Sequence, residues 1–334
     1  ATRAPSRHLD DLAVANRRAR EEVAVSLEDE ASGGAFDSQG NMVSSFFKMV
    51  TAFPSTFGAF QFTNRGGFHA FVAKFRADGT RLWSTYYGGS VEEWGHAIAT
   101  DPMDNIVVSG HTESGDFPVT AGAFQGGYIA GGFANRMGFM LRFSSSGARV
   151  FATYLGGDNF SDAYGITADR VGNLLVTGAT NGGGFPVSPG AYKLSVSGSK
   201  DAFIGKFSPD GTRQWLTLYG GSGEDVGYAI SAFPSGNMMI AGSTGSLDFP
   251  VTPGAAQTAY GGGVLDAFAL KFRKDGTPAW STFLGGSRIE LENDKRGLAG
   301  IATHWTGVAS MTGWTSSADF PTTPGAFQTT APMD

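Results

Sequence analysis

The chain has 334 residues, of which 50 are glycine and none is cysteine; 41% are hydrophobic, 16% are charged, and the formal net charge is −6. The hydrophobic content and modest charge exclude a disordered chain, and the lack of cysteine excludes disulfides, thiolate catalysis and cysteine-ligated zinc. A pI near 5.4 argues against a nucleic-acid partner, and no apolar run approaches the roughly 18 residues of a membrane span.

The first 30 residues differ in composition from the rest. Twelve of these 30 side chains are charged, against 42 of the 304 that follow. Residues 9–21 (LDDLAVANRRARE) contain no glycine and fit a helix. In residues 22–28 (EVAVSLE) Val23, Val25 and Leu27 fall on one face, as in a strand. We therefore predict a charged N-terminal segment over residues 1–30, as a helix, a closing strand or both, and a repeat domain over residues 31–334.

Two sequence markers recur with a common period of about 65 residues. The dipeptide Phe-Pro begins at Phe53, Phe117, Phe185, Phe249 and Phe320. The dipeptide Gly-Gly begins at Gly88, Gly156, Gly220 and Gly285. Because two independent markers share one period, the chain contains an internal repeat.

Each repeat predicts four short strands. One pair is exemplified by Ala70–Phe75 and Arg81–Tyr87 around an Asp-Gly turn, and the other by His96–Thr100 and Ile106–Gly110. Such turns require positive φ angles and are typical of β-hairpins. Four strands per period, with no helical pattern between them, predict an all-β fold, a β-propeller of four-stranded antiparallel blades.

The number of blades follows from counting these strands. Complete blades begin near Ala35, His96, Tyr164 and Tyr228, and a last inner hairpin near residues 300–313 has no outer strands after it. Because open strand edges promote aggregation, we predict five blades, the last one composite and closed by the N-terminal segment. An incomplete or longer array is the alternative.

The units AFVAKF-x3-G-x3-W-STYYGGS and DNIVVSGHTESGDFPVTAGAFQ resemble the SBBP-type β-propeller repeat of exported and surface proteins of bacteria. The resemblance covers roughly residues 35–330. It implies a propeller fold and an exported location, which is extracellular, at the cell surface or periplasmic. It implies no particular reaction.

Aromatic residues that recur at one repeat position predict packing between blades, with a ligand cage as the alternative for the tryptophans. The outermost strands carry Trp83, Phe151, Trp215 and Trp280. The Phe-Pro loops carry Phe117, Phe185, Phe249 and Phe320. We interpret both sets as structural core.

Acidic residues recur shortly after each Gly-Gly pair: Glu92, Glu93, Asp158, Asp162, Glu224, Asp225 and Glu290. We expect them on loops near the propeller axis, either as solvated charges, which we favour, or as a ring that binds a cation. The five histidines occupy different repeat positions without ligand spacing, and no catalytic triad is marked. We therefore expect no metal, no cofactor and no catalytic residue.

Departures from the repeat predict the binding face, because insertions commonly lie there. The loop from the second glycine of the pair to the inner strand is longest in the last repeat (residues 286–301), and a second insertion spans Gly126–Arg136. Both share a face with the Phe-Pro loops. The predicted contacts there are Trp94, Tyr128, Phe133, Arg288, Glu290, Glu292, Asp294, Lys295 and Arg296.

Three functions fit these observations. We favour a non-catalytic exported module that binds a protein partner or a surface glycan, as part of a larger assembly. The second is a polysaccharide hydrolase or lyase that uses carboxylates of the loop face. The third is a structural spacer. A repeated polar residue in a deep pocket would favour the enzyme.

Overall fold

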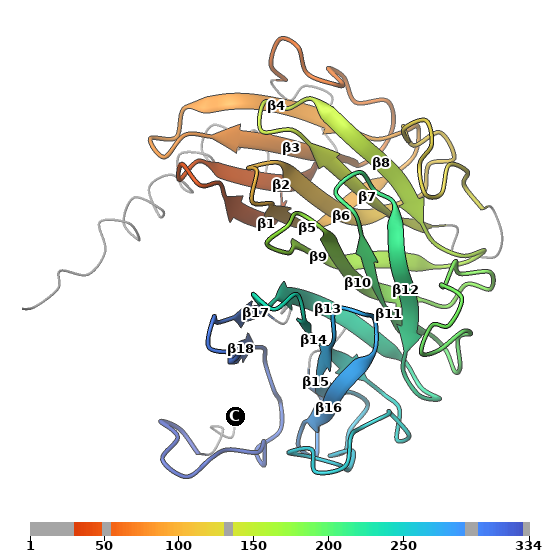
Figure 1. Ribbon diagram of the computed structural model, residues 1–334, viewed down its shortest axis with the longest axis vertical. Helices are drawn as coiled ribbons and strands as arrows, with labels where there is room; N and C mark the ends of the chain where they lie inside the picture. The colour runs from red at the N-terminus through yellow and green to blue at the C-terminus, as the bar shows by residue number, and fades with distance from the viewer. Residues whose placement is uncertain (1–29, 49–54, 130–135, 291–299, 330–334) are drawn as a thin grey trace, which may run out of the picture. The chain divides into compact units, whose positions relative to one another are not determined.

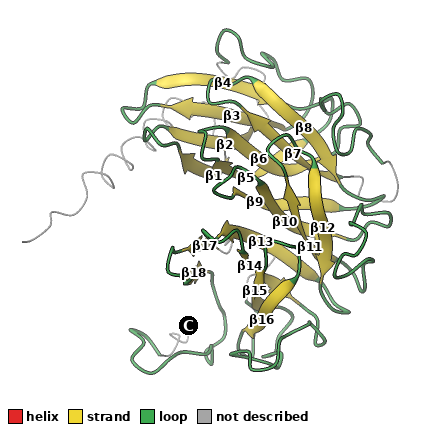
Figure 2. Cartoon of the chain, in the orientation of Figure 1, coloured by secondary structure: helices red, strands yellow, loops and turns green. Residues whose placement is uncertain are grey.

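The computed structural model describes residues 30–48, 55–129, 136–290 and 300–329. All regular structure in these ranges is β: four four-stranded antiparallel sheets and one two-stranded hairpin (Figure 2). No helix in the same ranges is long and apolar enough to cross a bilayer. The predicted all-β fold of four-stranded antiparallel sheets is therefore confirmed.

The strands follow one another in chain order within each sheet. Sheet 1 contains β1 (Glu30–Phe36), β2 (Met42–Lys48), β3 (His69–Phe75) and β4 (Arg81–Tyr87). Sheet 2 contains β5 (Glu93–Thr100), β6 (Ile106–Thr112), β7 (Met137–Phe143) and β8 (Arg149–Leu155). Sheet 3 contains β9 (Ser161–Ala168), β10 (Leu174–Thr180), β11 (Asp201–Phe207) and β12 (Arg213–Tyr219). Sheet 4 contains β13 (Asp225–Ala232), β14 (Met238–Thr244), β15 (Asp266–Phe272) and β16 (Pro278–Leu284). The last hairpin contains β17 (Gly300–Thr303) and β18 (Ala309–Thr312).

The chain divides into two compact units. The first comprises Ala1–Tyr128 and Gly138–Tyr154, and the second comprises Ile129–Met137 and Leu155–Asp334. Within the first unit β5 contacts β1, and within the second unit β13 contacts both β9 and β17 (strand labels in Figure 1). The first strands of neighbouring sheets in each unit therefore lie side by side.

The hairpins joining the third and fourth strands have the predicted Asp-Gly turns in sheets 1, 3 and 4, and a Ser-Gly turn in sheet 2. Gly79 and Gly211 both have a φ of +88°, a region that residues with a Cβ rarely adopt. The Asp78 carboxylate accepts a hydrogen bond from the Thr80 N–H at 2.8 Å, which closes the turn. The same arrangement recurs at Asp210.

The third strand of each sheet is buried almost along its whole length, and its basic residue reaches the turn of the inner hairpin. Lys74 Nζ lies 2.8 Å from Asp37, and Lys206 Nζ lies 3.0 Å from Asp169. In sheet 4 the acid is replaced by Phe233, and the Lys271 ammonium lies 4.7 Å from the ring centroid. Each of these three cations thus has an anion or an aromatic face beside it.

The phenylalanine of each Phe-Pro loop packs on the phenylalanine of the third strand in its own sheet. The ring centroids are 4.9 Å apart for Phe117 and Phe139, and 4.7 Å apart for Phe249 and Phe268. Phe185 packs in the same way at 5.0 Å in sheet 3. These rings are buried and form the core between a sheet and its loop.

The tryptophans of the fourth strands pack on the third strand of the next sheet where that strand is described. Trp83 lies 5.8 Å from Phe143, and Trp215 lies 6.1 Å from Phe272. After sheet 4 the described residues contain only the last hairpin, with no third strand, and Trp280 is 38% exposed. Trp280 was predicted to lie in the core, and the structure differs because no phenylalanine of a described third strand packs on it. Phe151 is buried.

Residues 1–29 lie outside the described residues, so the predicted N-terminal closing strand stays a prediction. Sheet 1 is complete with four strands of its own. The last hairpin has two strands in the described residues.

The two tryptophans of the second unit give a test of the packing account. We expect Trp215→Ala to lower the free energy of unfolding by about 3 kcal/mol, since a stacked ring is lost and a cavity is left. Trp280→Ala should cost about 1 kcal/mol, as is usual for a partly exposed residue. Urea denaturation measures both, and equal losses would contradict the account.

Candidate functional site

Four of the acidic residues that follow the Gly-Gly pairs are buried, and three of the four lie in strands. Glu93, Asp225 and Glu290 are fully buried, and the first two begin β5 and β13. The inner strands start three residues earlier than the sequence predicts, so these side chains do not reach solvent. The interpretation as solvated loop charges was wrong for these three residues and for Asp162, which is also buried.

Glu93, Asp225 and Glu290 each meet the first residue of a third strand around the first glycine of the pair. A Cβ added to Gly285 would lie 2.5 Å from Asp266 Oδ1 and 2.9 Å from Glu290 Oε2. Corresponding side chains crowd the other three glycines. The sets are Gly88 with His69 and Glu93, Gly156 with Met137 and Ser161, and Gly220 with Asp201 and Asp225. We call these four places the Gly-Gly junctions.

Three of the four Gly-Gly junctions contain a neutral pair or a basic group beside the acid. His69 Nδ1 lies 3.8 Å from Glu93 Oε2 in the first. The second has only Met137 and Ser161. In the third, Lys193 Nζ lies 2.6 Å from Asp201 Oδ2.

The fourth Gly-Gly junction contains two carboxyl groups and no basic partner in the described part of the chain. Gln257 occupies the repeat position of Lys193, and its Oε1 accepts a hydrogen bond from the Gly285 N–H at 3.0 Å. Glu290 Oε1 accepts a hydrogen bond from Thr315 Oγ1 at 2.8 Å. Asp266 Oδ1 and Glu290 Oε2 are buried without a hydrogen-bond partner, as are Asp201 Oδ1 and Asp225 Oδ1 of the third junction. This junction therefore concentrates negative charge.

Burial, together with the neighbouring Glu290 carboxyl, raises the pKa of Asp266 to about 6. Burial also raises the pKa of Tyr260 to about 12, and the charges of Asp266 and Glu290 act in the same direction. In the third junction burial raises the pKa of Asp225 to about 6. Ionisation is unfavourable at each of these acids because water no longer solvates the charge.

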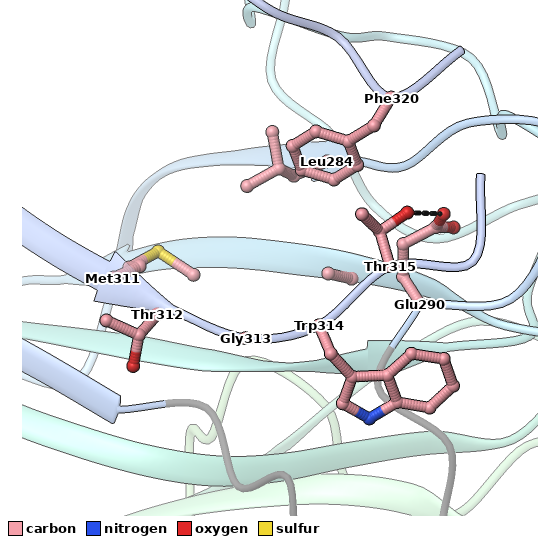
Figure 3. A pocket seen from close by; sticks show the side chains of 9 residues that line it. Leu284, Glu290, Met311, Thr312, Gly313, Trp314, Thr315 and Phe320 are labelled. Carbon is pink, nitrogen blue, oxygen red and sulfur yellow. Dashed lines mark hydrogen bonds between the residues drawn. The ribbon is translucent and has the colours of Figure 1, made fainter. Parts of the chain in front are cut away.

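A pocket of about 380 Å³ adjoins the fourth Gly-Gly junction. Figure 3 shows its walls, with Leu284 and Phe320 on one side and the Glu290 carboxyl hydrogen-bonded to Thr315. Its lining comprises Ala267, Leu284, Glu290, Met311, Thr312, Gly313, Trp314, Thr315 and Phe320. All nine belong to the second unit. The site is thus an apolar pocket that contains one buried carboxyl group.

The pocket occupies the place that a third-strand phenylalanine fills in the complete sheets. In sheet 4 the Phe268 ring lies 2.6 Å from where Gly242 would carry a Cβ, and it also packs on Phe249. Gly313 and Phe320 are the corresponding residues of the last repeat. Both line the pocket, and no described strand brings a phenylalanine between them.

The residues predicted for the binding face are distributed over both units. Trp94 lies on β5, where its indole stacks on His111 at 6.1 Å, and Tyr128 packs edge-on against Tyr154 at 5.7 Å. Arg288 is exposed, and its backbone N–H donates to Ser317 Oγ near the fourth junction. The remaining predicted residues lie outside the described ranges: Phe133, Glu292, Asp294, Lys295 and Arg296.

Sequence reasoning found Glu290 and Phe320 but missed Asp266 and Trp314. Asp266 begins a third strand, at the position where the other repeats have His69, Met137 and Asp201. A comparison of that position with Glu290 and Gln257, repeat by repeat, would have revealed the uncompensated acids. Trp314 stands where the earlier repeats have His111, Ala179 and Ser243.

Residues 150–186 match the family model described as a beta-propeller repeat, SBBP. The chain therefore contains an SBBP-type β-propeller repeat at these residues.

An uncharacterized WD repeat-containing protein of Acanthamoeba polyphaga mimivirus is 23% identical over 194 residues. The match covers 56% of this chain but only 14% of that protein. A Dyadobacter fermentans protein of unknown function has a TM-score of 0.42 at 12% identity, over 86% of this chain and 80% of that one. A gluconolactonase of Xanthomonas campestris has a TM-score of 0.36 at 14% identity, over 86% and 76%. Neither solved structure is similar enough to support an inference about activity.

The raised pKa of Asp266 gives a pH-dependent prediction. The folded-state pKa of about 6 exceeds the ordinary 3.8, so ionisation removes stability as the pH rises from about 4 to 6, and the loss persists above 6. Asp266→Asn removes this penalty. We expect the variant to gain melting temperature relative to the parent at pH 8 and to gain less, or nothing, at pH 4. Asp275→Asn, in an exposed turn, is the control, and equal effects of Asp266→Asn at both pH values would contradict the prediction.

Proposed function

We propose that this β-propeller repeat protein is a non-catalytic exported binding module whose pocket, beside the last hairpin, accepts a β-strand of a protein partner. The partner strand adds to β18 and places an aromatic side chain between Gly313 and Phe320. The observation that carries the proposal is the repeat itself. In sheets 2, 3 and 4 the phenylalanine of the third strand fills this place and packs on the phenylalanine of the Phe-Pro loop.

The backbone of the last hairpin supports strand addition. In the described residues β18 pairs with β17 alone, whereas the corresponding β14 pairs with both β13 and β15. One edge of β18 therefore has N–H and C=O groups available for another strand. An open edge beside an apolar pocket is the arrangement that extended peptides use to join a sheet.

The chemistry of the pocket favours a protein segment with an aromatic residue. Its walls include Leu284, Met311 and Phe320, which bind apolar side chains better than sugar hydroxyls. The N-terminal residues 1–29 contain no Phe, Tyr or Trp. They can supply an edge strand but not an aromatic ring.

The carboxyl pair argues against the glycosidase alternative. Such enzymes hold two carboxyl groups about 5–9.5 Å apart, on either side of the bond they cleave. Asp266 and Glu290 instead lie against each other around Gly285. Export to the surface or periplasm is supported by the resemblance of the repeat to those of exported bacterial proteins.

A hairpin peptide tests strand acceptance directly. Residues 264–286 of this chain contain the third and fourth strands of sheet 4 and are the natural probe. We expect the peptide to bind the intact protein in isothermal titration calorimetry. Phe268→Ala in the peptide should weaken binding by about 100-fold, equivalent to about 3 kcal/mol for a buried ring. Lys274→Ala, in the turn, should change little.

Two further measurements keep the test decisive. Phe320→Ala in the protein should weaken the same peptide, and fusing the hairpin after Asp334 should raise the melting temperature. Equal binding of the parent and Phe268→Ala peptides, or a fusion that leaves the melting temperature unchanged, would refute strand acceptance. Binding of a polysaccharide in place of the peptide would favour the glycan alternative.

A further inference from the structure

We propose that His96 and His111 form a binding site for one divalent transition-metal ion of the nickel or copper type. Both histidines belong to the first unit, whereas the pocket beside the last hairpin belongs to the second. The inference therefore does not depend on strand acceptance by β18.

Strand pairing brings the two histidines together, although they have no ligand spacing along the chain. Trp94 of β5 lies opposite His111 of β6, and the register shifts between Gly95 and Ala97. His96 is therefore the extra residue of a β-bulge, a feature that commonly re-aims a side chain. Its Nε2 lies 2.9 Å from His111 Nδ1. Two imidazole nitrogens thus face each other on one sheet.

The separation of these nitrogens fits two neighbouring ligands of one metal ion. At a metal–nitrogen distance of about 2.1 Å, two ligands at about 90° to each other lie about 3.0 Å apart. Tetragonal sites with such angles are typical of Cu²⁺ and Ni²⁺. Tetrahedral Zn²⁺ would need the nitrogens about 3.4 Å apart. The 2.9 Å between His96 Nε2 and His111 Nδ1 therefore favours the first geometry.

Metal binding requires a change of tautomer but no loss of a proton. The hydrogen bond between the rings places a proton on one of the two facing nitrogens. A neutral imidazole can carry its single proton on either nitrogen. When the donor ring carries it on the other nitrogen, both facing nitrogens offer a lone pair. His96 is only partly buried, so its ring can turn toward a shared ion and water can fill the remaining ligand positions.

Neighbouring side chains fix the orientation of the His111 ring. The Trp94 indole stacks on it, with 6.1 Å between the centroids and 13° between the planes. The indole Nε1 in turn donates a hydrogen bond to Glu92 Oε2 at 3.3 Å. His111 itself is 4% exposed. A ligand held in this way loses little conformational freedom on binding, which raises affinity.

The histidine pair is a departure from the repeat. The bulge recurs in sheets 3 and 4, but in neither sheet does a nitrogen ligand occupy either position. The corresponding residues are Tyr164 and Ala179 in sheet 3, and Tyr228 and Ser243 in sheet 4. Sheet 2 thus differs from these sheets at both positions at once. Packing of the repeat does not require this pair, which supports a function for it.

Isothermal titration calorimetry of the intact protein with NiCl₂ tests the proposal. We expect saturable binding of Ni²⁺ and none of Mg²⁺, which prefers oxygen ligands. His96→Gln keeps a group that can hydrogen-bond to His111 but removes an imidazole ligand. It should weaken Ni²⁺ binding at this site by at least about 10-fold, the effect that even substitutions outside the ligand shell commonly have.

His304→Gln is the matched control. His304 lies beside an indole too, 5.3 Å from Trp305 between centroids, but its ring hydrogen-bonds to Thr306 rather than to a second histidine. Its substitution should leave the affinity unchanged. The melting temperature of each variant, measured with EDTA, should equal that of the parent and so shows that a loss of binding is local.

Tryptophan fluorescence locates the ion. Ni²⁺ bound to His111 should quench the stacked indole, so Trp94→Phe should remove the quenching that saturates with binding, whereas Trp305→Phe should retain it. Unchanged affinity in His96→Gln, or quenching that survives Trp94→Phe, would overturn the proposal. Lack of saturable Ni²⁺ binding by the parent would also overturn it, and would mean that the two rings form a hydrogen-bonded pair only.

Discussion

The third strand of each blade carries the phenylalanine on which the rest of the blade depends. In sheet 4, Phe268 covers Gly242 of the second strand and packs on Phe249 of the Phe-Pro loop. The glycine is required because a Cβ there would meet the ring. The Phe-Pro loop is held against the sheet because its Phe249 packs on Phe268. Where the described chain lacks a third strand, at the last hairpin, the same two positions open into a pocket.

The Gly-Gly junctions impose a second constraint, on charge. Their first glycine leaves room for two buried side chains from adjoining sheets, and three of the four pairs are neutral or have a basic group beside the acid. The fourth holds Asp266 and Glu290 beside the pocket. The open packing position and the uncompensated charge therefore occur at one end of the described repeat array.

Local periodicity was enough to predict the repeat, the strand pattern and the Asp-Gly turns, because each depends on residues close together in the chain. It failed for Glu93 and Asp225, since the inner strands extend three residues beyond their apolar pattern and bury these acids. It also failed for Trp280, which is exposed because the described residues of the next sheet include no third strand to pack on it. The pocket was not predictable from any single repeat. It lies where a third-strand phenylalanine packs in the complete sheets, and the described residues of the last repeat include no third strand.

Amide hydrogen exchange along β18 tests the central claim, that this strand has an open edge, most directly. In an antiparallel sheet every second amide of an inner strand bonds to each neighbour. The account predicts that alternate amides of Ala309–Thr312 exchange fast, while all amides of the corresponding β14 residues Met238–Ala241 exchange slowly. Uniformly slow exchange throughout β18 would show that its edge is already paired within the chain, and would contradict the account.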